Sequence, residues 1–591
     1  MAAPLAGAEE AAAPAVATVS GKVIGPGGEP AAGAVVAVVI PRRMDPVAVV
    51  VAGADGRFAA TVPAGTYVLT ATHPQGVAAW SPPAAVEGKA VRNLRLAAPA
   101  EGFLLAGDLR DSTGAVLAGA EAHCLNYLSQ AIFVGRADGA GHYALRLPSA
   151  PYACRAVLGD LRSQFAEVAA GTARQDLVIR RLVPAPQAVV DWIRGQAIPL
   201  LTPRAGHGFA DLAPLRDVVG SARVVALGEA THGSREIFQM KHRLLEYLVS
   251  ELGFSVFAIE AAWPESEAVD EYVRTGQGDP VKALAGLYIW PWQTEEVLDL
   301  VRWMRQWNAA PGHRQVRFYG FDMQAGAVSA ERLAARLQQI DPTLAAEVNP
   351  ALRKLAALEP ASGVDAEYLA AVAAVAAALP RIAARLPEPA SAADRQGIVD
   401  RHYVQLLQQN TRYRGDSADS GDARELGMAD NVRWIAGVAE PGARVVVWAH
   451  NAHVSTFGGP YPAMGHYLAT ALGKDYLPVG FVFHHGSFQA MIRNPRGREL
   501  AELTVGPPPA GTLEDTFERA GWPLCLLDLR RLPASGAVAE WFRSPQQMRS
   551  IGSLFSGELN MMAELVPTDE FAALIYVEAT TRARPNPGVQ P

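Results

Sequence analysis

The chain lacks several features that would assign it to a class at once. Its net charge of −7 and the absence of any polybasic run argue against a nucleic-acid partner and against a membrane surface, both of which demand basic patches. The longest weakly polar run, LAAVAAVAAALP from Leu369, is too short to cross a bilayer and is broken by Pro380. Only three cysteines occur, without a Cys-x-x-Cys pair, so no thiolate metal site is expected.

Several catalytic signatures are missing as well. The sequence contains no Gly-x-Ser-x-Gly nucleophile elbow, no His-Glu-x-x-His zinc motif, no Walker loop and no complete Gly-x-Gly-x-x-Gly. Ser234 follows Gly233, but a serine at this place is interpreted as a residue of the first helical turn and not as a nucleophile. Carboxylates and histidines remain as the candidates for chemistry.

Short alternating strands dominate the N-terminal third and form an internal repeat. SGKVIGPGGEPAAGAVVAVV from Ser20 matches AGDLRDSTGAVLAGAEAHCL from Ala106, and ADGRFAATVPAGTYVLTA from Ala54 matches ADGAGHYALRLPSAPYACRA from Ala137. Gly, Pro and Asp-Gly turns separate the strands in both copies. We therefore predict two small antiparallel β-sandwiches, over residues 19–98 and 99–183, preceded by a disordered leader over residues 1–18.

Both copies resemble carboxypeptidase-regulatory-like (transthyretin-like) modules in their Gly-x-Val opening, Ala-Gly-Ala strand and Asp-Gly turn before Phe or Tyr. The resemblance implies non-catalytic accessory domains of an exported protein, which would contact cell-surface or other partners. The N-terminus has no basic region followed by an apolar one, so an intact signal peptide is absent from this chain. We expect a periplasmic or extracellular protein, and a cytoplasmic location stays open.

Two cysteines fall in the second module. Strand alternation points Cys124 and Cys154 inward, at the positions where the first copy has Val38 and Leu69. The pattern allows a disulfide in an oxidising compartment or two separately buried thiols. The sequence leaves this choice open.

From residue 184 to residue 581, strand-like apolar runs alternate with helical stretches, which predicts an α/β domain with a mainly parallel sheet. The segment 328–413 is almost wholly helical and rich in Ala and Leu, so we expect a large helical insertion over one end of the sheet. The tail, residues 582–591, is expected to be disordered. The predicted fold is thus multidomain, with two β-sandwiches followed by this α/β domain.

Four apolar runs of this domain end in ionisable residues. The runs ARVVALGEATHG, FSVFAIEA, VRFYGFDM and ARVVVWAHNAHV end at Glu229 and His232, at Glu260, at Asp322, and at His450 and His453. Parallel strands point the same way, so these residues would gather at one edge of the sheet, where ligands bind in open α/β folds. One such residue often only caps the next helix, but four strand ends with histidines on two of them favour a site.

Carboxylates around histidines support two kinds of chemistry. A carboxylate beside an imidazole fixes its tautomer and raises its basicity, so the ring can take a proton from water near neutral pH. A second histidine then stabilises the oxyanion or protonates the leaving group. The same cluster would also hold a metal ion, and spacing alone does not separate the two interpretations.

Five ordered motifs resemble the erythromycin esterase family. They are GEATHGSREIFQMKHRLLEYLVSELGFSVFAIEAAWPE, WPWQTEEVLDLVRWMRQWN, YGFDMQ, MADNVRWI and VVVWAHNAHV. The resemblance covers about residues 190–581. It implies an α/β core with a helical insertion and ester hydrolysis by activated water, without a metal or another cofactor.

The resemblance also implies roles for single residues. The expected catalytic set consists of the general base His232, together with Glu229, Glu260 and His450. The residues expected to bind substrate are His453, Asp322, Lys241, Trp290 and Trp292. Lys241 stands where the antibiotic-degrading members carry arginine, and Glu425 stands where many members carry aspartate, so these departures concern the substrate more than the reaction.

The sequence thus predicts a hydrolase that cleaves an ester or lactone of a bulky organic substrate by His-activated water, without a covalent serine intermediate. One alternative is a metal-dependent hydrolase that uses the same cluster. Another is acyl transfer or ring closure, in which a substrate alcohol replaces water. A non-enzymatic alternative is an exported binding or surface protein. The expected partner is a small molecule, with neither nucleic-acid binding nor membrane insertion.

Overall fold

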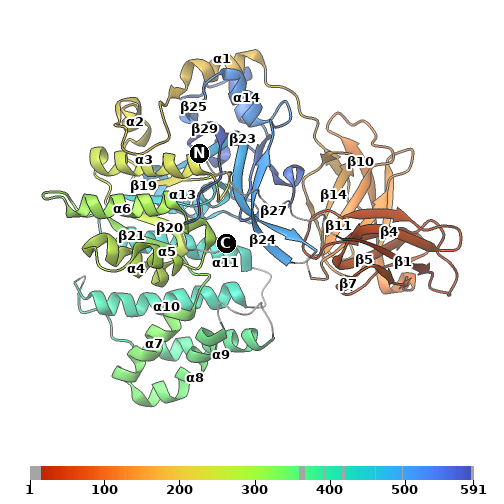
Figure 1. The fold of residues 1–591 in the computed structure, drawn as a ribbon, viewed down its shortest axis with the longest axis horizontal. Helices are drawn as coiled ribbons and strands as arrows, with labels where there is room; N and C mark the ends of the chain where they lie inside the picture. Colours follow the sequence, from red (N-terminus) through yellow and green to blue (C-terminus); the bar gives the residue numbers. More distant parts are fainter. Residues whose placement is uncertain are drawn as a thin grey trace, which may run out of the picture. The chain divides into compact units, whose positions relative to one another are not determined.

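The computed structural model describes residues 15–126, 128–358, 366–391, 393–415, 420–459, 461–495 and 497–586, which fall into two compact units (Figure 1). The first unit contains the chain up to Val183 together with Met491–Ala501 and Leu554–Ala563, and the second contains the rest. These two late segments lie within the range that the sequence assigned to the α/β domain. The protein is multidomain, with a β-rich N-terminal region and a C-terminal α/β domain.

The first module is built from two sheets with a common apolar core. One sheet has the order β4-β1-β8 and the other the order β3-β2-β5-β6. Their bounds are β1 (Val16–Ile24), β2 (Val35–Val39), β3 (Ala48–Val51), β4 (Arg57–Pro63), β5 (Gly65–His73), β6 (Gly76–Trp80) and β8 (Lys89–Val91). Strand β8 runs parallel to β1, so the module is not purely antiparallel. Residues 16–18 belong to β1 and not to a leader, and residues 1–14 lie outside the described residues.

The second module repeats this arrangement with the sheets β13-β10-β17 and β12-β11-β14-β15. The bounds are β10 (Gly102–Asp111), β11 (Glu121–Asn126), β12 (Ala131–Arg136), β13 (His142–Pro148), β14 (Tyr152–Leu158), β15 (Leu161–Arg162) and β17 (Leu177–Ile179). Cys124 on β11 pairs directly with Cys154 on β14, and a disulfide joins them. The structure therefore has the bonded form of the two forms that the sequence allowed.

The α/β domain contains a mixed sheet whose main path has the order β18-β25-β29-β23-β19-β22-β20-β21. The bounds are β18 (Ile198–Pro199), β19 (Val224–Leu227), β20 (Val256–Ala262), β21 (Arg317–Asp322), β22 (Val445–Trp448), β23 (Tyr476–Asn494), β25 (Leu524–Asp528) and β29 (Ala573–Thr580). Neighbours from β29 to β21 pair in parallel, whereas β25 pairs antiparallel with both β29 and β18. The parallel part contains all four strands whose ends carry the candidate residues.

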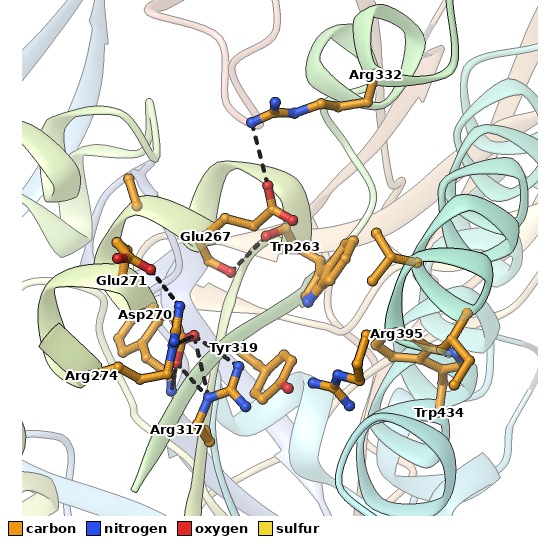
Figure 2. A pocket seen from close by; sticks show the side chains of 15 residues that line it. Trp263, Glu267, Asp270, Glu271, Arg274, Arg317, Tyr319, Arg332, Arg395 and Trp434 are labelled. Atoms are coloured by element: carbon orange, nitrogen blue, oxygen red, sulfur yellow. Dashed lines mark hydrogen bonds and ion pairs between the residues drawn. The ribbon is translucent and has the colours of Figure 1, made fainter. Parts of the chain in front are cut away.

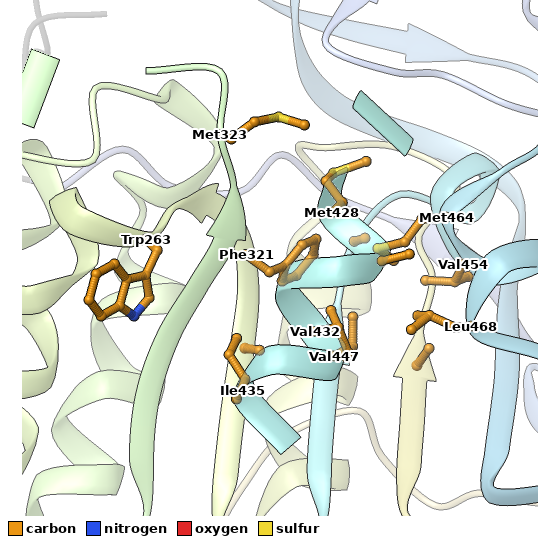
Figure 3. Close-up of a cluster of buried hydrophobic side chains, with 14 of the residues drawn as sticks. Trp263, Phe321, Met323, Met428, Val432, Ile435, Val447, Val454, Met464 and Leu468 are labelled. Carbon is orange, nitrogen blue, oxygen red and sulfur yellow. The ribbon is translucent and has the colours of Figure 1, made fainter. Parts of the chain in front are cut away.

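The sequences of these central strands are continuously apolar because helices cover both faces of the sheet. Every residue of β19 and of β22 is buried. Figure 3 shows how Met428 and Val432 of α11 (Ser420–Trp434) pack against Phe321 of β21 and Val447 of β22. All four side chains are fully buried, so apolar packing fixes α11 on the sheet.

The helical insertion consists of α7 (Ala327–Ile340), α8 (Pro342–Leu358), α9 (Ala366–Arg385) and α10 (Arg395–Arg414) (Figure 1). Pro380 lies inside α9 and does not end it, contrary to the sequence-based expectation. Among the described residues, α9 is the one helix that is long and apolar enough for a membrane span by length and composition alone, in contrast to the sequence-based expectation of an apolar run that is too short. Its apolar residues, Tyr368, Val372, Val375, Leu379 and Ile382 among them, join the main core of the domain.

The residues after β29 are ordered as far as residue 586, in contrast to the expected disordered tail. The backbone N–H of Ala583 donates to the carbonyl of Gly233, and that of Asn586 donates to the carbonyl of Gln293. Both Ala583 and Asn586 are buried. This segment therefore holds the loop between β19 and α3 (Arg235–Leu252), while residues 587–591 lie outside the described residues.

Candidate active site

The loop after β19 places Glu229 and His232 in direct contact. The Nδ1 atom of His232 lies 2.6 Å from Oε1 of Glu229, and the carboxylate is completely buried. Lys241 and Trp448 both donate to Oε2 of Glu229, each at 2.7 Å. Because the carboxylate accepts the Nδ1 proton, Nε2 of His232 keeps its lone pair and is free to take a proton.

Lys241 contacts the carboxylate oxygen of Glu229 that does not bind His232. Its side chain is 0% exposed, and its ammonium lies 4.4 Å from the centre of the Trp448 ring. Burial lowers the pKa of Lys241 to about 8, against the opposing effect of the Glu229 charge. The substrate-binding role expected for Lys241 stays a prediction, and the contact that the structure shows for its ammonium is the buried ion pair with Glu229.

His450 follows β22 and begins the short helix α12 (Asn451–Val454). Its Nδ1 accepts the backbone N–H of Ala452 at 3.2 Å, so the neutral ring carries its proton on Nε2. Burial, reinforced by the nearby charges of His232 and His453, holds the pKa of His450 well below its usual value. Its Nε2 is buried without a hydrogen-bond partner, and the ring centre lies 5.0 Å from that of His232.

Glu260, at the end of β20, is bonded directly to His450 after β22 and, through Arg424, to Asp322 at the end of β21. Oε2 accepts the backbone N–H of His450 at 3.2 Å, and Oε1 accepts a bond from Arg424 at 2.8 Å. Burial alone would raise the pKa of Glu260, but the charges of His453, His232 and Arg424 outweigh it and hold that pKa well below its usual value. Glu260 is therefore a permanent anion near neutral pH.

Arg424 is the functional residue that the sequence-based prediction missed. It reaches from α11 to Asp322 as well as to Glu260, with Nη2 2.8 Å from a carboxylate oxygen of each. Asp322 is completely buried and accepts the backbone N–H of Met323. It therefore anchors Arg424, and its expected role in substrate binding stays a prediction. The sequence pointed to Arg424 only indirectly, since two buried carboxylates at neighbouring strand ends need a cation between them.

His453 lies between two carboxylates. Its Nε2 is 3.3 Å from Glu260, and its Nδ1 is 2.7 Å from Glu425 of α11. Burial alone would lower the pKa of His453, but the charges of Glu260 and Glu425 raise it to about 10. His453 is thus an imidazolium near neutral pH and belongs to the same ion network as Glu260.

The two expected substrate-binding tryptophans lie on a 3-10 turn, Trp290–Trp292. Trp292 is buried, donates from Nε1 to the carbonyl of Glu260 at 2.8 Å, and sets its ring 6.1 Å from that of His232. It packs edge-on against the His232 ring, and its expected role in substrate binding stays a prediction. Trp290 is only partly buried.

Ser234 has no role in this geometry. Its side chain is completely buried and contacts the hydroxyl of Thr231 at 3.2 Å. It occupies the N-cap position of α3 without making a side-chain cap bond. Among the described residues, no group of three or more His, Cys, Asp or Glu side chains is arranged to hold a metal ion.

The fold and the candidate site define an α/β domain with a histidine–carboxylate cluster at the carboxyl ends of its parallel strands. The sequence model of the erythromycin esterase family matches residues 249–580, and that of the carboxypeptidase regulatory-like domain matches residues 18–98. The chain belongs to the erythromycin esterase family. Glu229 and His232 precede the matched stretch, whereas Glu260, Asp322 and His450 lie within it.

Individual relatives agree with this assignment. The erythromycin esterase type II of Escherichia coli is 24% identical over 383 residues, which are 58% of this chain and 89% of the relative. The putative hydrolase YbfO of Bacillus subtilis (strain 168) is 24% identical over 421 residues, covering 66% and 90% of the two chains. A solved structure described as a succinoglycan biosynthesis protein has a TM-score of 0.57 and 26% identity, over 67% of this chain and 98% of that one. The family match, the erythromycin esterase type II and the putative hydrolase support a general ester hydrolase activity.

Proposed function

We propose that the protein cleaves an ester or lactone by water that His232 activates. The observation that supports this proposal most directly is the pair of neighbouring imidazole rings of His232 and His450. Nε2 of His232 is free to accept a proton, and Nε2 of His450 has a proton without a partner. A base and a hydrogen-bond donor at this spacing are the two groups that acyl transfer to water needs.

The reaction follows from these two atoms. Water attacks the acyl carbon while its proton passes to Nε2 of His232, and Glu229 stabilises the imidazolium that forms. The negative charge on the former carbonyl oxygen is stabilised by the Nε2 proton of His450. The tetrahedral intermediate then collapses, the bond to the leaving oxygen breaks, and His232 returns its proton to that oxygen. The products are a carboxylic acid and an alcohol.

Glu260 acts on His450 through the backbone. Its carboxylate accepts the N–H of His450 and is itself fixed by Arg424. A fixed charge at this place holds α12 and the His450 ring without a need to move during the reaction. We assign Glu260, Arg424, Asp322 and His453 to one ion network that positions His450.

Two loops favour a bulky apolar substrate. Among the described residues of the second unit, the exposed aromatic side chains are Tyr288, Phe457 and Tyr461. Tyr288 stands on the loop that leads to Trp292, and the other two follow α12, which carries His453. Tyr288 also adopts a positive φ of 57°, which is strained for a bulky residue and is characteristic of functional loops. Exposed aromatic rings on the loop before Trp292 and on the segment after α12 suit an ester with a large apolar part.

A panel of esters and lactones of graded size tests the proposal. His232→Ala should lower kcat by roughly 10²–10⁴-fold, the scale expected for a general base. Wild-type turnover in a folded His232→Ala variant would overturn the assignment. Metal analysis of protein purified without chelators, and activity after chelation, separate this mechanism from metal-dependent hydrolysis. Product analysis in the presence of alcohols separates it from acyl transfer.

The buried Cys124–Cys154 disulfide supports an exported protein, since such bonds persist mainly in oxidising compartments. We therefore propose a periplasmic or extracellular location, with the β-sandwich modules as spacers or docking domains. Fractionation of cells that produce the full-length protein tests this location.

A further inference from the structure

A cavity lies between α4 (Trp263–Thr275), the start of β21 and the helical insertion (Figure 2). Its volume is about 470 Å³, within the range of small-molecule sites. Apolar and aromatic side chains form part of its wall, namely Trp263, Phe318, Tyr319, Ile398, Val399 and Trp434. A neighbouring cavity also contacts Arg332, Arg395 and Val399, so the two are parts of one groove.

The carboxylates of this cavity are already engaged. Asp270 accepts bonds from both Arg317 and Arg274, the closest at 2.9 Å (Figure 2). Glu271 accepts a bond from Arg274, and Glu267 accepts the hydroxyl of Tyr403 at 2.9 Å. These acids therefore have little capacity left to bind a cationic ligand.

Two guanidinium groups keep most of their donors free. The nearest carboxylate oxygen to Arg332 belongs to Glu267, at 3.7 Å, and the side chain is 61% exposed. Arg395 donates to the carbonyl of Ala439 and lies 3.5 Å from Glu440, with its side chain 50% exposed. Each guanidinium offers five N–H groups, so the unused hydrogen-bonding capacity of the groove consists of donors.

We propose that this groove binds an organic monocarboxylate with an apolar or aromatic body. The carboxylate lies against the guanidinium groups of Arg332 and Arg395, which match its planar geometry. The apolar body lies against Trp263, Val399 and Trp434. Four arginines and three carboxylates line this cavity, and Glu440 contacts both Arg317 and Arg395 from beside it, so the charges nearly balance, which suits a monoanion better than a phosphate dianion.

This groove is distinct from the catalytic centre. Strand β21 contributes Arg317 and Tyr319 to the cavity at its start and carries Asp322 at its other end. Helix α11 contributes Trp434 at its end and carries Arg424 nearer its start. A bound carboxylate would contact the elements that hold the Arg424–Asp322 pair without contacting His232 or His450.

Isothermal titration of the full chain with benzoate tests the proposal. The wild type should bind benzoate saturably, and Arg395→Gln and Arg332→Gln should each weaken binding by about tenfold or more, since each removes a charge-assisted hydrogen bond. The matched control is Arg302→Gln, which changes an arginine on α6 (Glu295–Ala309) that is also 50% exposed. Benzyl alcohol, the neutral analogue of similar shape, should bind at least tenfold more weakly than benzoate.

A variant whose new side chain fills the cavity tests whether benzoate binds there. Ala268 lines the cavity from an exposed position on α4, so Ala268→Trp should block the site and leave the fold and ester turnover intact. Loss of benzoate binding in this variant supports the proposal. Unchanged binding in Ala268→Trp, equal weakening in Arg302→Gln, equal affinity for benzyl alcohol or no saturable binding by the wild type would each overturn it. None of these readouts depends on the proposed hydrolysis.

Discussion

Lys241 donates a hydrogen bond to Glu229 across 2.7 Å, and both side chains are completely buried. Lys241 and Trp448 are the two donors to Oε2 of Glu229, the carboxylate oxygen that does not contact His232. A buried ion pair is sensitive to the loss of either partner, because the remaining charge then has no compensation. The ammonium of Lys241 therefore compensates the buried charge of Glu229, the carboxylate that contacts His232.

Removal of this ammonium should destabilise the α/β domain. Lys241→Met leaves Glu229 buried without its cation, and a loss of about 3–5 kcal/mol is expected in urea unfolding. Lys241→Arg is the matched control, since it keeps the charge. Equal stability of Lys241→Met and the wild type would show that the pair is not stabilising.

Lys241 should also make stability depend on pH. Its pKa falls from 10.5 to about 8 on folding, so between these values the unfolded chain binds a proton that the folded chain does not. Stability of the wild type relative to Lys241→Arg should therefore rise with pH across this window, by up to roughly 1.4 kcal/mol per pH unit. Denaturant titrations of both proteins at pH 7, 8, 9 and 10 measure it, and a constant difference would contradict the low pKa.

His450 should matter for turnover but not for its pH dependence. Since the pKa of His450 lies well below its usual value, the ring is neutral throughout the working range and acts as a donor. His450→Phe should lower kcat by about 10²–10³-fold, the scale for one oxyanion donor. The position of the acid limb of the pH profile should not change, because His450 stays neutral in the working range. A shift of that limb in His450→Phe would mean that His450 itself titrates during turnover.

Arg424 should act as a positioning residue. Arg424→Gln leaves Glu260 and Asp322 without their shared cation, so the unfolding free energy should fall by about 3–5 kcal/mol and kcat should fall more than KM rises. Arg424→Lys keeps the charge and should recover part of both losses. A purely structural role would reduce the amount of folded enzyme without changing the kcat of the folded fraction.

The disulfide should stabilise the N-terminal unit alone. Replacement of Cys124 and Cys154 together by alanine should lower its unfolding free energy by about 3–4 kcal/mol, as expected for a closed loop of this length. Ester turnover should not change. Calorimetry of the double variant measures the loss, and Cys525→Ala, which changes the free buried cysteine, controls for the loss of a buried side chain.

The candidate site was predictable where it depends on strand order. The ionisable ends of β19, β20, β21 and β22 are visible as apolar runs that end in Glu, Asp or His, and the structure brings these four strands together in parallel. Glu229, His232, Glu260 and His450 meet for this reason. The β-rich modules were equally visible, because turn chemistry and alternation are local properties.

The sequence by itself thus determined which residues are candidates for chemistry, because hydrophobic periodicity and the ends of strands depend on residues that are neighbours in the chain. The tertiary structure decided what several of them do. Lys241 and Asp322 are ion-pair partners inside the protein, and Arg424 comes from a helix more than 100 residues beyond Asp322. Ion pairs over such separations depend on how α11 packs against the sheet, and that packing is a property of the whole core. The same reason explains why Pro380 continues a helix and why residues 582–586 bind the catalytic loop.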